Sequence, residues 1–306
     1  MKWVVGLSMI AITMGWMATA TIPASPVSID QTSLKFLPPE TVGVAVIDVA
    51  GLLNAPLVQD SLKKVPLPPN FQQFVDGTGI NPQTDIDKVT VAKIGQKDAI
   101  VVVQGRIDKL KVEQFLKDKG KQADAYLGQT IYYDNDSAIA LLDNVVLLGQ
   151  VDGVKKALDQ IQLPGSSPLR SDLTAAIQTI DAGNQVWAVG EFSINDLGTA
   201  GVRGPAPVVE MLKALQSGTY QMRVDTDIHA RATGTFADQD SAKNVADLVK
   251  GALAIAKLQV AKQQPDLLHA LDGIQVSNSG TTITMTVSES GDLLKKLQGV
   301  RTALLK

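Results

Sequence analysis

Short apolar runs alternate with amphipathic segments along this chain. The run Thr41–Asp48 is apolar and rich in β-branched residues, which is typical of a buried strand. The segment Ala242–Ala261 instead spaces its apolar residues at helical intervals and is rich in alanine. These criteria predict strands at 41–48, 88–94, 99–107, 126–133, 138–149, 185–192, 219–236 and 273–287. They predict helices at 57–65, 71–75, 110–119, 154–161, 171–180, 205–215, 242–261 and 293–305.

Turn residues indicate that three of the longer apolar regions fold back on themselves. We expect hairpins that turn at Asp143–Asn144, near Asp227 and at Asn278–Gly280. The order of strands and helices is then similar in the two halves of the chain. This order predicts an α+β fold with two similar domains, each an antiparallel sheet with helices packed on one face, produced by tandem duplication. One sheet continuing across both halves is the alternative.

Breaks in the pattern define the domain boundaries. We expect a first α+β domain at 35–162, a linker and connecting helix at 163–184, and a second α+β domain at 185–306. Residues 1–20 have the layout of a secretory signal peptide: Lys2, an apolar stretch, and the small residues Ala18 and Ala20 before the cleavage point. Residues 21–34 are expected to form a flexible tether. For residues 1–20, the alternative is an uncleaved N-terminal anchor or a short buried helix.

Composition narrows the possible functions. The chain has 306 residues, no cysteine and a formal net charge of −3. The absence of cysteine excludes disulfides, thiol nucleophiles and thiolate metal sites. The acidic balance argues against a nucleic-acid partner, which attracts basic surfaces. With the signal peptide removed, we expect no membrane span and a secreted or periplasmic location in a bacterial cell envelope.

Two stretches and the repeated element order carry a family resemblance. The stretches are Leu37–Asp48, with the sequence LPPETVGVAVID, and Ser167–Leu173, with the sequence SPLRSDL, which leads to Gln185–Val189. With the strand and helix order that recurs in both halves, they resemble secreted bacterial tandem-repeat proteins of unknown function. The resemblance implies an envelope protein without an assigned activity, and it transfers no functional residues.

Motifs for catalysis are incomplete in this sequence. Ser61 and Lys64 have the Ser-x-x-Lys spacing of penicillin-recognising enzymes, but the Ser-Asp-Asn and Lys-Thr-Gly elements of those enzymes are absent. The glycines of Gly198–Gly204 could cradle an anion, but they lack the spacing of a dinucleotide-binding loop. We therefore assign no catalytic, cofactor-binding or metal-ligating residue and expect no cofactor.

One stretch of alternating polar residues is a candidate binding face. Arg223, Asp225, Asp227, His229 and Arg231 would share one side of an unbroken strand. Histidine beside carboxylates can serve a metal or acid–base site. The simpler interpretation is a solvated sheet face with charges paired across strands, and a turn near Asp227 would break the shared face.

These observations favour an exported, non-enzymatic envelope protein that acts through protein–protein binding or assembly. A carrier or chaperone for an apolar, lipid-like ligand is the alternative, because the alanine-rich segment Ala242–Ala261 could form one wall of an apolar groove. A hydrolase that uses Asp/Glu acid–base chemistry is the second alternative, and it requires two carboxylates that converge in a cleft. The expected partner is thus an envelope protein or an apolar ligand.

Overall fold

The computed structural model describes residues 31–62, 69–95, 98–162, 169–191, 212–261, 264–293 and 296. The chain divides into two compact units, of which the first ends at Thr179 and the second begins at Ile180. The predicted signal peptide 1–20, residues 21–30 of the predicted tether and linker residues 163–168 lie outside the described residues. Most of the helices predicted at 205–215 and 293–305 also lie outside them.

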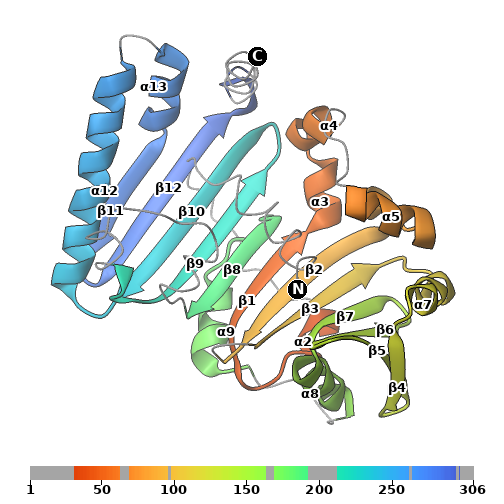
Figure 1. Cartoon of the computed structure of the whole chain (residues 1–306). Helices are drawn as coiled ribbons and strands as arrows, with labels where there is room; N and C mark the ends of the chain where they lie inside the picture. The colour runs from red at the N-terminus through yellow and green to blue at the C-terminus, as the bar shows by residue number, and fades with distance from the viewer. Residues whose placement is uncertain are drawn as a thin grey trace. The chain divides into compact units, whose positions relative to one another are not determined.

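The first unit is built on an antiparallel sheet (Figure 1). Its strands are β1 (Thr41–Asp48), β2 (Ile86–Ile94), β3 (Asp98–Gly105), β4 (Gln122–Tyr126), β5 (Gln129–Asp134), β6 (Ser137–Leu142) and β7 (Val145–Gln150). Its helices are α2 (Gln31–Leu34), α3 (Val49–Asn54), α4 (Pro56–Leu62), α5 (Pro69–Thr78), α6 (Pro82–Asp85), α7 (Lys109–Asp118), α8 (Val151–Gln162) and α9 (Ser171–Gln178). Within this unit the strand order is β1-β2-β3-β7-β6-β5-β4.

Helices cover both faces of this sheet, where the sequence pattern indicated one face. On β3, Val101 and Val103 belong to a core cluster with Leu116 of α7. Ile100 points to the opposite face, because side chains alternate along a strand. There it lies next to Gly153 of α8. The strand β3 is therefore buried on both sides, which explains its continuous run of apolar residues.

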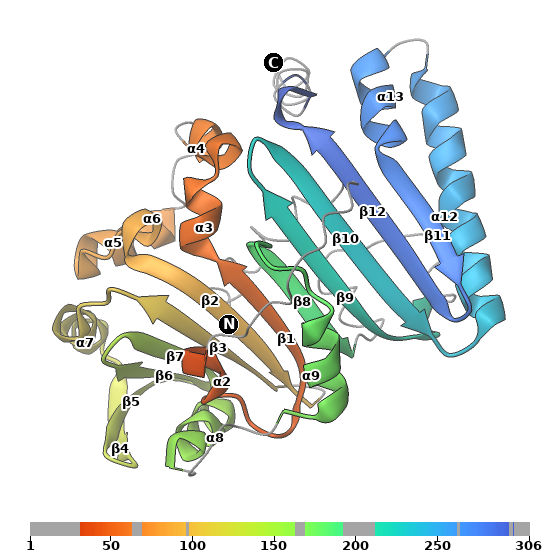
Figure 2. The same ribbon diagram turned by 180° about the vertical axis from the view of Figure 1, so that it is seen from behind.

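The second unit also contains an antiparallel sheet, with the strand order β8-β9-β10-β12-β11 (Figure 2). Its strands are β8 (Val186–Glu191), β9 (Leu215–Val224), β10 (Asp227–Phe236), β11 (Ile274–Ser279) and β12 (Thr282–Ser290). Among the described residues, α12 (Gln239–Val260) and α13 (Pro265–Asp272) are helices of this unit. The α+β class with antiparallel sheets predicted from the sequence is thus confirmed.

The helix α12 begins at a side-chain cap and packs on the sheet through small residues. The Asp238 carboxylate accepts a hydrogen bond of 2.7 Å from the backbone N–H of Ser241, so the cap lies before the Asp240 or Ser241 expected from the sequence. Ala242 and Ala246 are fully buried against Phe236 of β10. Their small side chains allow the helix backbone to lie close to the strands.

The two units share a strand order. In the first unit β1, β2 and β3 are followed in space by β7 and then β6. In the second unit β8, β9 and β10 are followed by β12 and then β11. The hairpin β4–β5 at the far edge of the first sheet has no counterpart among the described strands of the second unit.

Two sequence predictions need correction. Residues 31–34, predicted as the end of a flexible tether, instead form α2. Ser33 of this helix is buried, and its hydroxyl donates to the Gln104 side chain and accepts from the Thr90 hydroxyl. The region 126–133 is not one strand, because Leu127 and Gly128 have φ values of 51° and 76°. Two consecutive positive φ values form the tight turn between β4 and β5.

No helix in the described part of the chain is both long enough and apolar enough to cross a membrane.

Candidate functional site

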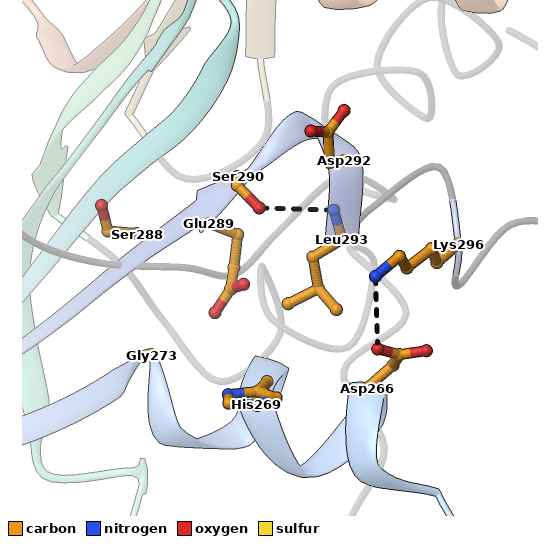
Figure 3. A pocket seen from close by; sticks show the side chains of 9 residues that line it. All are labelled: Asp266, His269, Gly273, Ser288, Glu289, Ser290, Asp292, Leu293 and Lys296. Atoms are coloured by element: carbon orange, nitrogen blue, oxygen red, sulfur yellow. Dashed lines mark hydrogen bonds and ion pairs between the residues drawn. The ribbon is translucent and has the colours of Figure 1, made fainter.

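A pocket lies in the second unit where β12 ends beside α13 (Figure 3). Its volume is about 420 Å³, which falls within the range of small-molecule sites. The pocket is lined by Asp266, His269, Gly273, Ser288, Glu289, Ser290, Asp292, Leu293 and Lys296. Charged and hydroxyl side chains therefore dominate its lining.

The position of Glu289 follows from the alternation along β12. Ile283, Val287 and Glu289 are separated by even numbers of residues, so they face the same side of the sheet. Ile283 and Val287 are buried in the apolar clusters under α12. Glu289 is the last residue in this inward series, and it is only 7% exposed.

The Glu289 side chain lies against the end of α13. A Cβ atom on residue 273 would lie 2.1 Å from Glu289 Oε1. The glycine at position 273 therefore leaves the space that this carboxylate oxygen occupies. No hydrogen bond or ion pair joins the Glu289 carboxylate to any other residue that the structure describes, and its oxygens are not fully enclosed. Burial raises the pKa of Glu289, the nearby His269 opposes this shift, and Asp272 adds to it.

The charges around Glu289 are mostly acidic. Asp266 and Asp292 line the same pocket, and Lys296 is its one cationic lining residue other than the titratable His269. The Lys296 ammonium lies 3.9 Å from the Asp266 carboxylate (Figure 3). The pocket therefore presents a surplus of negative charge, and its lysine is directed toward Asp266 rather than toward Glu289.

The predicted binding face is divided by a hairpin turn. Arg223 at the end of β9 lies directly opposite His229 on β10, so the two side chains share a face. Asp225 and Asp227 lie in or beside the turn, where the Asp225 carboxylate accepts a hydrogen bond of 2.9 Å from the Asp227 N–H. Arg223 Nε is 3.4 Å from Asp225 Oδ2. Four of the five predicted residues thus gather at one hairpin.

Arg231 is the exception among the predicted residues. It lies opposite Gln221 in the register of β9 and β10, and its guanidinium is 3.2 Å from the Asp181 carboxylate. Gln221 is buried and accepts a hydrogen bond of 2.7 Å from the Asp181 N–H. Arg231 therefore belongs to a structural network that ties the start of the second unit to its sheet.

The hairpin has a geometry that a divalent cation could use. Ligand atoms of Asp225, Asp227 and His229 lie within 4.8 Å of one another. His229 Nδ1 is 2.9 Å from the Ser288 hydroxyl, which would orient the imidazole ring. The Arg223 guanidinium, however, already supplies positive charge next to Asp225. The arrangement is equally suited to a solvated ion-pair cluster, as the sequence interpretation allowed.

Sequence reasoning missed Glu289 as a site residue. The signal was present, because a glutamate that continues the inward series Ile283, Met285 and Val287 is an exception to the apolar pattern. His269 is exposed on α13 and lines the same pocket as Glu289. Both histidines of the chain therefore lie next to the end of β12, one at Ser288 and one at Glu289.

The outer side of α12 is a second candidate surface. Leu248, Ile255 and Leu258 are 37%, 59% and 79% exposed. With Gly251 they have the spacing i, i+3, i+7 and i+10, which places them in one stripe along the helix. We call these four residues the α12 stripe. It lies away from the buried residues Ala242 and Ala246.

Comparison with known proteins supports the fold. No family model matches this chain, and no curated protein matches it. The structure is similar to that of the Treponema protein TP0453 in crystal form III, with a TM-score of 0.52 and 12% identity over 87% of this chain and 96% of that chain. For crystal form I the TM-score is 0.50, with 11% identity over 88% and 96% of the two chains. At these identities the similarity establishes the fold alone.

Proposed function

We propose that this chain is an exported, non-enzymatic protein that binds another protein through the α12 stripe. The observation that carries the proposal is the exposure of Ile255 and Leu258, at 59% and 79%, on the outer side of one helix. Leu248, Ile255 and Leu258 are aliphatic anchors at i, i+7 and i+10 on one helix face, and a helix docks into a partner's apolar groove through anchors on one face. The N-terminal signal-like segment at 1–20 supports export.

A protein partner fits the stripe better than a lipid surface. Helices that lie on membranes usually carry aromatic anchors and a strongly basic polar face. The α12 stripe has no aromatic residue, and Asp247 lies beside Lys243 and Lys250 on the exposed part of the helix. The chain as a whole is acidic, with a formal net charge of −3, which anionic lipids do not attract.

The strand orders also support the proposal that the two units arose by tandem duplication within a secreted bacterial protein. Five strands follow the same spatial order in each unit. Because each unit presents its own helices over a similar sheet, duplication would have freed one copy to acquire a binding surface. The α12 stripe lies in the second unit, where the helix is 22 residues long, compared with 10 for α7 in the first.

Neither alternative function has comparable support. A carrier for an apolar ligand requires an apolar cavity, but the pocket at Glu289 is lined chiefly by charged and hydroxyl side chains. A hydrolase requires a second carboxylate aimed at the same point as Glu289. Figure 3 shows Asp292 directed away from Glu289, and Asp266 directed toward Lys296.

Site-specific photo-crosslinking in the cell envelope tests the proposal. A photoreactive residue at position 258 is expected to capture a defined protein, whereas the same residue at position 110 is not. Leu110 is a matched control because it is 77% exposed, close to the 79% of Leu258, and lies on α7 of the first unit.

Binding to the captured partner is then measured with purified variants. Leu258→Asp should weaken binding by more than tenfold, because burial of one such side chain contributes about 1.5–3 kcal/mol. Leu110→Asp should leave binding unchanged. Equal binding by both variants, or capture of lipid in place of protein at position 258, would show that the proposal is wrong. An intact mass that begins at Met1 in envelope fractions would contradict the cleaved signal peptide.

A further inference from the structure

Glu289 is a largely buried carboxylic acid that has no ion-pair partner among the described residues. Glu289 is 7% exposed as a residue, and burial removes part of the hydration of its carboxylate. Buried charges in proteins normally have a partner of opposite sign or several hydrogen bonds. Glu289 has neither among the residues that the structure describes, and its oxygens are not fully enclosed.

The nearby cations are already engaged with other carboxylates. Lys296 Nζ lies 3.9 Å from Asp266, and Lys257 Nζ lies 2.9 Å from Asp272. His269 is exposed on α13, so solvent screens its attraction for Glu289. The lysines near the pocket therefore form no ion pair with the Glu289 carboxylate among the residues that the structure describes.

The carboxylate is also open to a ligand from one side. Figure 3 shows Glu289 extending from β12 toward His269 and Gly273, into the hollow that these residues line. The absence of a side chain at Gly273 allows Oε1 to lie against α13. Leu293, which is half-buried, adds an apolar wall on the opposite side.

We propose that this pocket binds an organic cation, an ammonium or guanidinium group, whose charged end contacts the Glu289 carboxylate. A metal ion fits this pocket less well. In the described part of the chain, three ligand groups within 4.8 Å of one another occur at Asp225, Asp227 and His229, and not around Glu289. A volume of about 420 Å³ suits a group of several heavy atoms. Asp292 at the rim would steer such a cation inward.

This ligand chemistry could come from two sources. A small free amine could enter the pocket alone, or a lysine or arginine side chain of another protein could enter it from a bound segment. The two sources share the cationic group and differ in what flanks it. The pocket can therefore be tested first with simple ammonium and guanidinium compounds, and then with lysine and arginine side chains in peptides.

Protonation gives the site a specific pH dependence. Glu289 must be ionised to attract a cation, and burial raises the pKa of its carboxyl above the ordinary value. The other charged groups that face the pocket are Asp266, His269 and Asp272 on α13, and Asp292 and Lys296 beyond β12. Affinity should therefore rise with pH as the Glu289 carboxyl ionises, and then level off.

Calorimetric and NMR titration of the full mature chain with butylammonium and butylguanidinium tests the proposal. We expect a Kd on the order of 1 mM for these probes, and no binding of the matched neutral and anionic probes butanol and butyrate. Capped lysine and arginine amides, alone and within short peptides, identify the source of the group. Similar Kd values for free and peptide-bound cations indicate a small amine, and tighter binding of the peptides indicates a protein segment.

Two variants decide whether Glu289 is responsible. Glu289→Gln keeps the shape of the side chain and should weaken binding at least about tenfold, as expected for loss of a charge-assisted contact. Asp240→Asn removes an exposed charge in the first turn of α12, outside the pocket lining, and should change the Kd by less than about twofold. Thermal unfolding confirms that both variants are folded. The proposal is overturned if neither cation binds, if butanol binds as well as butylammonium, or if the two variants lose affinity equally.

Discussion

Replacement of Gly273 by alanine tests how closely Glu289 is held against α13. Gly273 has φ −64° and ψ −16°, which alanine adopts without strain. The new Cβ would be 2.1 Å from Glu289 Oε1, whereas ordinary contacts begin at 3.4 Å. The carboxylate must therefore move by about 1.3 Å, and it can do so because it is the free end of a flexible side chain.

Two opposing effects determine how Gly273→Ala changes the free energy of unfolding. Alanine reduces the conformational entropy of the unfolded chain, which should stabilise the fold by about 0.4–1 kcal/mol. The displaced Glu289 side chain should cost about 1–3 kcal/mol, as expected for overpacking of a filled site. The Cβ is also 3.0 Å from the Ser288 carbonyl oxygen, but this contact is the same whatever residue occupies position 289.

A double-mutant cycle isolates the contact. Urea unfolding gives the stability of the wild type, Gly273→Ala, Glu289→Ala and the double variant. We expect Gly273→Ala to destabilise the wild type by about 1 kcal/mol and to be neutral or stabilising beside Glu289→Ala. A coupling energy below about 0.3 kcal/mol would refute the close contact on which the description of the pocket depends.

Two further predictions concern buried groups. Burial raises the pKa of Tyr220 to about 12, so the tyrosinate absorbance step near that pH should disappear in Tyr220→Phe. Because the neutral phenol is favoured in the folded state, stability should fall as the pH rises from 10 toward 12 in the wild type and less so in the variant; equal losses would contradict this. Leu147→Ala should lower the free energy of unfolding by about 2–5 kcal/mol, because Leu147 is fully buried in β7. Leu110→Ala is the exposed control and should change it by less than about 0.5 kcal/mol in urea unfolding.

Local sequence patterns were sufficient for most regular elements. The strand predicted at Thr41–Asp48 has these bounds in the structure, and the hairpin predicted at Asp143–Asn144 joins β6 to β7 at those residues. Both depend on neighbours in the chain, namely a run of β-branched apolar residues and the turn preferences of aspartate and asparagine. The turn at Leu127–Gly128 was missed because leucine rarely adopts a positive φ, although Gly128 was a signal for a break in the strand.

Long-range contacts decided the candidate site. The alternation along β12 places Glu289 inward, but only the packing of Gly273 and His269 beside it makes that position a pocket. A long-range contact also removes Arg231 from the predicted binding face, since it pairs with Asp181, 50 residues away in the chain. Sequence by itself determined most of the strands, the longer helices and the α+β class, because these follow from local hydrophobic periodicity. Only the tertiary structure decided which charges are buried or paired, because their partners are distant in the chain.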